Sequence, residues 1–312
     1  MQKNHIPNIM KKQLLLFLAT ILLFGCGEKQ NPNKPNNEQP ETQTTTVQEV
    51  PPVYVLSDEF GENFLLLAYL GDEETPRIPD SLKSYKYIIY NGTYYPVTFE
   101  GFQFEDEENN MYRETFYNFQ NLSGWLYKMQ SGKLLEHPVD EFDAIWDAPL
   151  LVDEKFKTEN IVYPLSNYEN GRKVISDLSE TLKADFEKRY SRKIIHGWCD
   201  AVFGENNEYQ FVNMQFKNKG TEALGVSALV KNDEVVAVIE DYATWNEESV
   251  WRVDDGGEFG GISIDLVTSK DGVLTIYTAD SGPEGTLYQN YILIDGVFYG
   301  GTVYGSFYQA PY

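Results

Sequence analysis

Short turns between apolar runs are the feature that most constrains the fold of this chain. Asn91-Gly92 and Asp295-Gly296 each separate two runs rich in Tyr, Ile and Val. Both central residues of a two-residue type I′ turn need a positive φ, which Asn, Asp and Gly adopt at little cost. Such a turn joins neighbouring antiparallel strands, so the sequence predicts hairpins over residues 87–95 and 291–299.

Other segments share this β pattern, because they are rich in β-branched and aromatic residues or alternate apolar with polar ones. The predicted strands are residues 64–69, 113–119, 124–129, 208–216, 224–231, 235–240, 262–266 and 274–278. Asn232-Asp233 joins two of them as a further hairpin, and Lys270-Asp271-Gly272 joins another two. The chain should therefore consist mainly of antiparallel sheet.

One segment has the period of a helix instead. Val174, Leu178, Leu182, Phe186 and Tyr190 recur every four residues, and charged residues fall off this stripe. The spacing predicts an amphipathic helix over residues 173–191 whose apolar stripe packs on the sheet that follows. The predicted fold class is α+β: a mainly antiparallel β-sheet with one amphipathic helix packed on it.

Turn-forming residues cluster at 140–149 and 164–171, which indicates a boundary near residue 150. We expect a β-rich half over residues 53–150 and an α+β half over residues 151–312. One continuous sheet across this boundary is the alternative. Aromatic residues make up 14% of the chain, which is ample for a buried core in either arrangement.

The N-terminal residues have the pattern of a secretion signal. Lys3, Lys11 and Lys12 precede an apolar run over residues 14–24. This run is too short to cross a bilayer, which needs about 20 apolar residues in a helix. Residues 1–25 are therefore predicted to be a signal peptide that is removed from the mature protein.

The end of this segment resembles the lipobox of bacterial lipoproteins, through Leu23, Gly25 and Cys26. Phe24 departs from that pattern, in which a smaller residue is usual. The resemblance implies cleavage before Cys26, a diacylglyceryl thioether on its sulfur and an acyl chain such as palmitate on its new amine. The lipid bilayer is then a partner through acylated Cys26, and several chains anchor a protein firmly.

Residues 26–52 are predicted to form a disordered tether, because they are rich in Pro, Asn, Gln, Thr and Glu and almost free of apolar residues. The tether holds the folded part away from the lipid headgroups. Gly27 stands where an Asp would be the familiar signal for retention at the inner membrane. We therefore expect a cell-envelope location at the outer membrane rather than the inner one.

The mature chain is strongly acidic. Residues 1–25 contain three of the 25 basic residues and no acid, so 22 basic and 48 acidic residues remain, a formal charge of −26. Such a charge repels phosphate backbones and anionic lipid surfaces, which excludes nucleic acid as an expected partner. It is typical of a soluble acidic surface, and it also attracts cations, including Ca²⁺, or a basic protein.

His196 and Cys199 are the one thiol and imidazole pair at a spacing that could serve a metal or a catalytic dyad. A zinc site would need two more ligands, and a thiol enzyme usually has a third residue that orients the imidazole. With Cys26 acylated, Cys199 is the only thiol left, so no disulfide within the chain is expected. We interpret Cys199 as a core residue beside a partly exposed histidine.

Two acidic, Gly-rich loops are candidates for a metal or ligand site. The first contains Asp254, Asp255 and Glu258, and the second contains Asp280 and Glu284. Carboxylates and carbonyls are the ligands that Ca²⁺ prefers, although the spacing is not that of an EF-hand. The two loops could converge if they lie at the same end of a sheet, but solvated loops between strands are the simpler interpretation.

Four aromatic residues are candidates for a binding surface: Trp245, Trp251, Tyr304 and Tyr308. Exposed aromatic side chains can stack on sugar rings or fit a protein groove. Aromatic residues are also good strand formers, so packing on the sheet is the alternative.

The sequence lacks the phosphate-binding P-loop, the Rossmann glycine pattern and the Gly-x-Ser-x-Gly motif of serine esterases. No cofactor is indicated beyond a possible Ca²⁺. We therefore expect non-catalytic binding of a glycan, a peptide or a partner protein at the envelope. A carboxylate-dependent glycan hydrolase and a Ca²⁺-stabilised scaffold are the alternatives.

Overall fold

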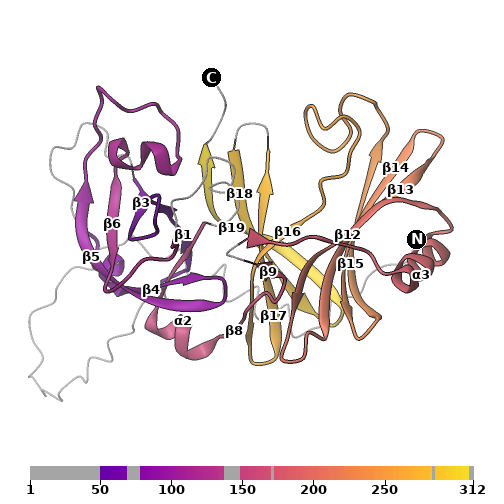
Figure 1. The fold of residues 1–312 in the computed structure, drawn as a ribbon, viewed down its shortest axis with the longest axis horizontal. Coiled ribbons are helices and arrows are strands. Elements are labelled where there is room, and N and C mark those ends of the chain that lie inside the picture. Colours follow the sequence, from indigo (N-terminus) through magenta and orange to yellow (C-terminus); the bar gives the residue numbers. More distant parts are fainter. Residues whose placement is uncertain (1–49, 69–77, 137–147, 170–171, 283–284, 309–312) are drawn as a thin grey trace, which may run out of the picture. The chain divides into compact units, whose positions relative to one another are not determined.

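The described part of the chain is built mainly from antiparallel strands (Figure 1). The computed structural model describes residues 50–68, 78–136, 148–169, 172–282 and 285–308. Every strand pairing among these residues is antiparallel, and helix α3 (Glu180–Tyr190) packs on one of the sheets. The predicted α+β fold class is confirmed.

The first sheet contains seven short strands. Their bounds are β1 (Val53–Tyr54), β2 (Leu56–Ser57), β3 (Asn63–Leu67), β4 (Tyr85–Tyr90), β5 (Thr93–Gln103), β6 (Gly124–Met129) and β7 (Leu150–Asp153). Two 3-10 turns lie between them, η1 (Asp80–Ser84) and η2 (Phe116–Asn121).

One segment closes this sheet into a barrel. The spatial order of the strands in the sheet is β1-β7-β4-β5-β6-β3-β2. The two outermost strands, β1 and β2, are therefore consecutive in sequence, and only Val55 separates them. Tyr54 pairs with Leu150 on one side, and Leu56 pairs with Leu65 on the other. The same segment therefore supplies both ends of the sheet, and we call this part the N-terminal barrel.

Two five-stranded sheets follow. The helix-bearing sheet has the order β11 (Ser176–Asp177), β12 (Ile194–Phe203), β13 (Tyr209–Lys219), β14 (Glu222–Lys231), β15 (Glu234–Thr244). The C-terminal sheet has the order β19 (Val297–Tyr308), β18 (Gly285–Ile294), β17 (Val273–Ser281), β16 (Ser263–Lys270), β8 (Ile161–Tyr163). Three further elements complete the fold, α2 (Glu154–Glu159) and the paired β9 (Tyr168–Glu169) and β10 (Arg172–Lys173).

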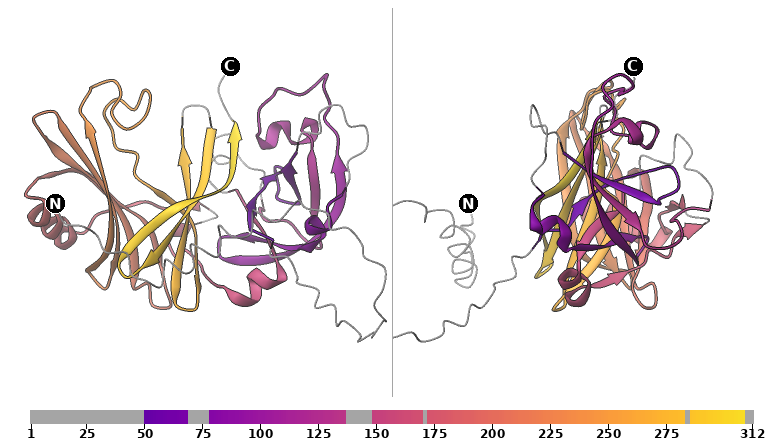
Figure 2. Two further views of the ribbon diagram at one scale, coloured as in Figure 1. Left: turned by 180° about the vertical axis from the view of Figure 1, so that it is seen from behind. Right: turned by 90° about the vertical axis from the view of Figure 1, so that its left-hand side faces the viewer.

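Helix α3 (Glu180–Tyr190) covers one face of the helix-bearing sheet (Figure 2). Leu182 and Phe186 are buried against Val212, Met214 and other inward residues of this face. On the opposite face, Phe203, Phe211 and Leu229 pack against Ile264, Val267 and Ile276 of the C-terminal sheet. The helix-bearing sheet is thus buried on both faces.

The C-terminal sheet also packs against the N-terminal barrel. Tyr54 of β1 stacks on Tyr288 of β18 with ring centroids 4.1 Å apart. The Tyr54 hydroxyl donates a 2.5 Å hydrogen bond to Asp265 of β16. Residues 48–312 accordingly form one compact unit. The predicted boundary near residue 150 falls at the first residue of β7, whose strand pairs with β1 and β4.

The predicted hairpins are confirmed by their backbone angles. Asn91 and Gly92 have φ of 41° and 69°, and Asp295 and Gly296 have φ of 50° and 75°. Asn232-Asp233 and Asp271-Gly272 also have positive φ between paired strands. Dipeptides of Asn, Asp and Gly therefore located these turns correctly.

The predicted helix begins seven residues later than expected, at Glu180 rather than 173. Ser179 caps it, because its side chain accepts a hydrogen bond from the N–H of Leu182. Residues 176 and 177 instead pair with β12, as expected for a segment that follows the β-branched Val174 and Ile175. The apolar stripe from Leu178 onward packs on the sheet that follows, as predicted.

The strand predicted over residues 113–119 is wrong, because this segment contains the 3-10 turn η2. Asn118 is fully buried, and its side chain donates to Asn110 and to the carbonyl of Arg113. A buried side chain that bonds nearby groups competes with sheet pairing. Aromatic content alone suggested a strand here.

None of the helices among the described residues is long and apolar enough to cross a bilayer.

Candidate binding groove

A hollow lies at one end of the C-terminal sheet. It has a volume of about 560 Å³. Its lining residues come from β17, β18 and β19, from the loop before η2 and from the loop between β15 and β16: Glu114, Trp251, Arg252, Asp280, Gly282, Gly285, Thr286, Leu287, Phe307 and Tyr308. Small-molecule sites typically have about 300–1,000 Å³, so the groove is large enough for an organic ligand.

Strand alternation explains which side chains face this groove. Asp280 of β17 pairs with Leu287 of β18, and Gly285 of β18 pairs with Tyr308 of β19. Asp280, Leu287 and Tyr308 are all exposed. Their sequence neighbours Ala279, Tyr288 and Phe307 are buried against the N-terminal barrel. This end of the sheet therefore has one buried face and one face open to solvent.

Glu114 ties the N-terminal barrel to the end of β19. Its backbone N–H donates to the Tyr308 carbonyl at 2.8 Å, and its carboxylate accepts the Tyr308 N–H at 2.6 Å. Both backbone groups of Tyr308 are thus occupied. The edge of β19 offers no free hydrogen-bonding groups at this residue.

The other wall of the groove comes from the 245–262 loop, which Asp255 organises. The Asp255 carboxylate accepts the backbone N–H groups of Val250, Trp251, Arg252 and Gly257 at 2.6–3.0 Å. Burial acts to raise the pKa of Asp255, but these N–H groups outweigh it and hold the pKa below its ordinary value. Asp255 is therefore an ionised anchor for the backbone that carries Trp251.

Two buried amides fasten this loop to the helix-bearing sheet. Asn213 donates to the carbonyl of Ile262 and accepts its N–H, both at 3.0 Å. Gln215 donates to the carbonyl of Gly257 and accepts the N–H of Phe259. Each side chain pairs with the loop as a neighbouring strand would, so the loop is held in place at both contacts.

Trp251 is half-buried at the base of the groove wall. Its ring lies edge-on to Phe259, with centroids 5.2 Å apart. Phe259 in turn occupies the space above Gly225, where a Cβ atom would lie 2.4 Å from the ring. The indole N–H of Trp251 is buried and has no acceptor among the described residues.

The structure brings three of the sequence-predicted site residues into this groove: Trp251, Asp280 and Tyr308. Asp280 of the second acidic loop thus lies in the same groove as Trp251 of the 245–262 loop, but the lining does not include Asp255. Asp254 and Glu258 are exposed and are not among the described lining residues. Sequence analysis did not single out Glu114 or Leu287, because neither belongs to a recognisable motif.

The remaining predicted residues lie elsewhere. Trp245 packs over Gly257, where a Cβ atom would lie 2.4 Å from its ring. Tyr304 lies in β19, but its side chain and all of Glu284 are outside the described residues. Within the described ranges, no three His, Cys, Asp or Glu side chains gather in a way that could hold a metal ion.

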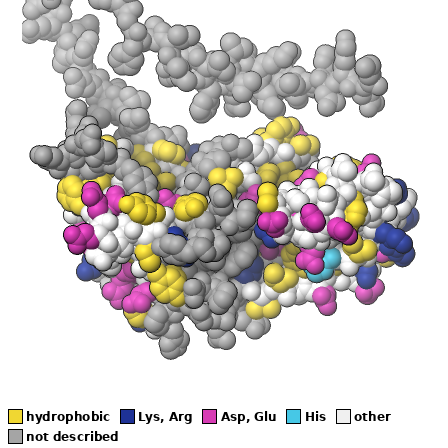
Figure 3. Space-filling model, turned by 90° about the horizontal axis from the view of Figure 1, so that it is seen from above, with side chains coloured by type: hydrophobic (Ala, Val, Ile, Leu, Met, Phe, Trp, Pro, Cys, Tyr) yellow, Lys and Arg dark blue, Asp and Glu magenta, His cyan; other side chains and the backbone are white. Residues whose placement is uncertain are grey.

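Acidic and hydrophobic side chains are interspersed over the described surface that Figure 3 shows. The groove therefore combines aromatic, aliphatic and charged side chains rather than a single kind.

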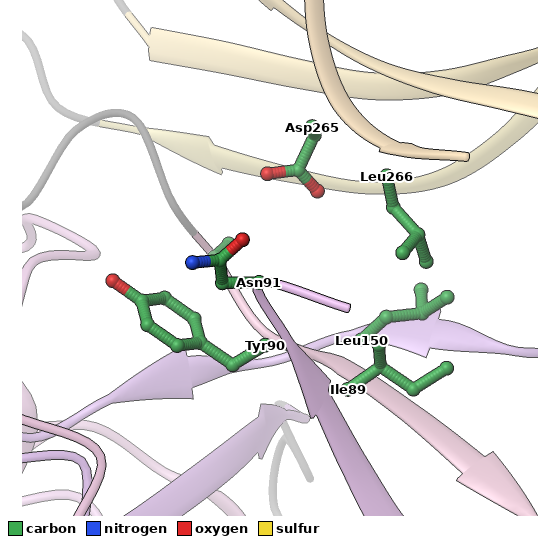
Figure 4. A pocket seen from close by; sticks show the side chains of 7 residues that line it. Ile89, Tyr90, Asn91, Leu150, Asp265 and Leu266 are labelled. Atoms are coloured by element: carbon green, nitrogen blue, oxygen red, sulfur yellow. The ribbon is translucent and has the colours of Figure 1, made fainter. Parts of the chain in front are cut away.

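A second, much smaller cavity lies between the N-terminal barrel and β16 (Figure 4). Its volume is about 10 Å³, which is the size needed for a single water molecule. Asn91 and Asp265 line it together with the apolar side chains of Ile89, Leu150 and Leu266. The cavity is too small for an organic ligand.

Cys199 is buried in the core under α3, and His196 is exposed and lies beside Trp198. Burial, assisted by the carboxylate of Asp200, raises the pKa of the Cys199 thiol to about 11. A thiol with such a pKa is protonated at neutral pH and is a poor nucleophile.

We therefore expect Cys199 to resist thiol reagents in the native protein at neutral pH. A disulfide-exchange reagent should modify it only after denaturant has unfolded the chain. The measurement is the rate of thiolate release with and without denaturant. Fast modification of the folded protein would contradict the buried, protonated thiol.

Comparison with known protein families, with curated proteins and with solved structures finds no match to this chain.

Proposed function

We propose that this protein is a lipid-anchored envelope protein that binds a ligand, without chemical turnover, in the groove at the end of the C-terminal sheet. The observation that carries this proposal is the groove itself, which combines Trp251, Asp280 and Tyr308 from separate elements. A hollow lined by apolar and aromatic side chains with a few placed polar groups is the usual form of a binding site.

The surroundings of the two groove carboxylates favour binding over hydrolysis. Asp280 is exposed to solvent, and one oxygen of Glu114 accepts the N–H of Tyr308. A glycosidase needs one carboxyl group whose environment keeps it protonated and a second that attacks or activates water. Asp280 is thus a solvent-exposed side chain and Glu114 a backbone acceptor, and Cys199 is too deeply buried to act as a nucleophile.

The proposed anchor is acylated Cys26, at the outer membrane. Replacing Cys26 by alanine should abolish incorporation of radiolabelled palmitate, because the sulfur that starts lipid attachment is lost. The variant should also move from the membrane fraction to the soluble fraction or accumulate uncleaved. Replacing Cys199 by alanine is the matched control, and it should leave labelling unchanged. Equal labelling of the Cys26 variant and the unmodified protein would refute the anchor.

The groove is tested with the full-length, acylated protein purified in detergent. Tyr308→Ala removes an exposed groove side chain, and we expect about a tenfold loss of binding to the insoluble fraction of the producing cells' envelope. Tyr299→Ala is the matched control, because Tyr299 lies in the same strand with a similar exposed fraction, 43% against 48% for Tyr308. Co-sedimentation measures the binding. If both variants bind the envelope fraction equally well, the groove is not the binding site.

A further inference from the structure

We infer that the ligand of the groove is a neutral saccharide chain that lies across β17, β18 and β19. This inference rests on the proposed function and adds the chemical class of the ligand. Neighbouring strands lie about 4.8 Å apart, so the row from Asp280 through Leu287 to β19 spans about 10 Å. The walls at Trp251 and Glu114 extend the groove beyond that row.

The backbone around the groove argues against an extended peptide. Peptides that bind to sheets do so by adding a strand to a free edge, where main-chain hydrogen bonds supply the affinity. Here β17, β18 and β19 are paired with one another through Asp280, Leu287 and Tyr308. Glu114 occupies the N–H and carbonyl of Tyr308. A ligand in the groove therefore has to be recognised by side chains.

The lining also differs from a groove that takes an amphipathic helix. Such a groove needs a continuous apolar floor with several anchor pockets. In this groove the exposed apolar floor is Leu287, because Phe307 is only 5% exposed. Carboxylates and hydroxyl-bearing side chains surround it. The floor is too small and too polar for a helix.

A saccharide matches the aromatic and carboxylate side chains of the groove. The face of a sugar ring carries C–H groups that pack on aromatic rings, and its edge carries hydroxyls that donate and accept hydrogen bonds. Tyr308 is the most exposed aromatic side chain of the lining, which also includes the half-buried Trp251. The exposed carboxylate of Asp280 offers acceptor oxygens for hydroxyl donors. A ligand hydroxyl at the Trp251 wall is also the kind of acceptor that the buried indole N–H lacks.

The charge of the groove favours a neutral saccharide over an acidic one. Three charged side chains line the groove: the carboxylates of Asp280 and Glu114 and the guanidinium of Arg252. The acids outnumber the base there, and the mature chain has 22 basic against 48 acidic residues. A carboxylated or sulfated saccharide would bring further negative charge next to these carboxylates. Because the acids outnumber the base, added negative charge opposes binding, so acidic glycans should bind more weakly than neutral ones.

The experiment uses full-length protein in detergent with three defined probes: unsubstituted hexose oligomers, the same oligomers oxidised to uronic acids, and an extended lysine-rich peptide. Isothermal titration measures the affinities. We expect binding of neutral oligomers and at least tenfold weaker binding of the uronic acids. Tyr308→Ala should weaken the neutral oligomers about tenfold, and Tyr299→Ala should not. Asp280→Asn should weaken neutral oligomers and reduce the difference between neutral and acidic ones.

The outcomes separate the two proposals. If the peptide binds and Tyr308→Ala weakens it while no oligomer binds, the groove stands and the saccharide is wrong. If acidic oligomers bind as well as neutral ones, the charge argument is wrong and the ligand class with it. If Tyr308→Ala and Tyr299→Ala behave alike with every probe, the groove is not the binding site and both proposals fail.

Discussion

Replacing Lys173 by methionine should lower the free energy of unfolding by about 3–5 kcal/mol, because it leaves a buried carboxylate without its partner. The Lys173 ammonium lies 3.2 Å from the Asp200 carboxylate, and their side chains are 15% and 5% exposed. The ammonium also donates to the Ser263 hydroxyl at 2.8 Å and to the Ile264 carbonyl at 2.6 Å. Asp200 accepts the N–H of Ile264 in return. This pair joins β10, β12 and β16.

The destabilisation caused by Lys173→Met should depend on pH. Burial raises the pKa of Asp200, and Lys173 and the N–H of Ile264 oppose that rise. Without Lys173 the pKa of Asp200 rises further, so its protonated form is favoured in the folded state. A raised carboxyl pKa contributes stability that is present at low pH and lost as pH rises through it. The destabilisation by Lys173→Met should therefore be larger at about pH 7 than at about pH 4.

Urea unfolding of the full-length protein measures this effect at both pH values. Lys183→Met is the matched control, because Lys183 pairs with Glu180 at 3.9 Å on the surface, where their side chains are 40% and 91% exposed. Lys183→Met should lower the free energy of unfolding by less than about 1 kcal/mol. Adding Asp200→Asn to the Lys173 variant should restore part of the stability. Equal losses for Lys173→Met and Lys183→Met would show that the buried pair does not stabilise the fold.

Much of the fold was predictable from the sequence, because the backbone preferences of the turn residues determined where the hairpins lie. Asn91-Gly92 and Asp295-Gly296 need positive φ at both positions, and few other residues adopt it, so the hairpins were predictable. The start of α3 was less predictable, because Val174 and Ile175 fit a helical period as well as a strand. The closure of the barrel at Val55 depends on pairings between distant strands, and no local pattern encodes these.

The candidate site was predictable only in part. Trp251, Asp280 and Tyr308 were conspicuous by residue type, but nothing local indicates that they share a groove. Asp255 illustrates the ambiguity, since an acid in a Gly-rich loop fits a cation site and a backbone anchor equally well. The structure assigns it four backbone N–H groups. Glu114 enters the groove through a contact between residues far apart in sequence, which a single sequence does not reveal.

Asp255→Asn should destabilise the protein by about 1.5–3 kcal/mol and weaken ligand binding in the groove at least tenfold. The substitution replaces one acceptor oxygen by an NH₂ group, which then faces backbone donors. The N–H groups of Val250, Trp251, Arg252 and Gly257 lose part of their charged acceptor. Trp251 is displaced as the loop relaxes, so stability and binding fall together.

The pH dependence separates this anchor from an ordinary surface acid. The N–H groups outweigh burial and hold the pKa of Asp255 below its ordinary value, so its contribution is present above the unfolded pKa of about 3.9 and is lost as pH falls through the folded pKa. The stability difference between the native protein and Asp255→Asn should therefore shrink as pH falls below about 4. Asp254→Asn is the matched control, because Asp254 is exposed and adjacent in sequence. Denaturant unfolding and titration with neutral oligomers measure both effects. If Asp255→Asn and Asp254→Asn unfold and bind alike at neutral pH, Asp255 does not hold the groove wall, and the position of Trp251 must depend on Asn213 and Gln215 alone.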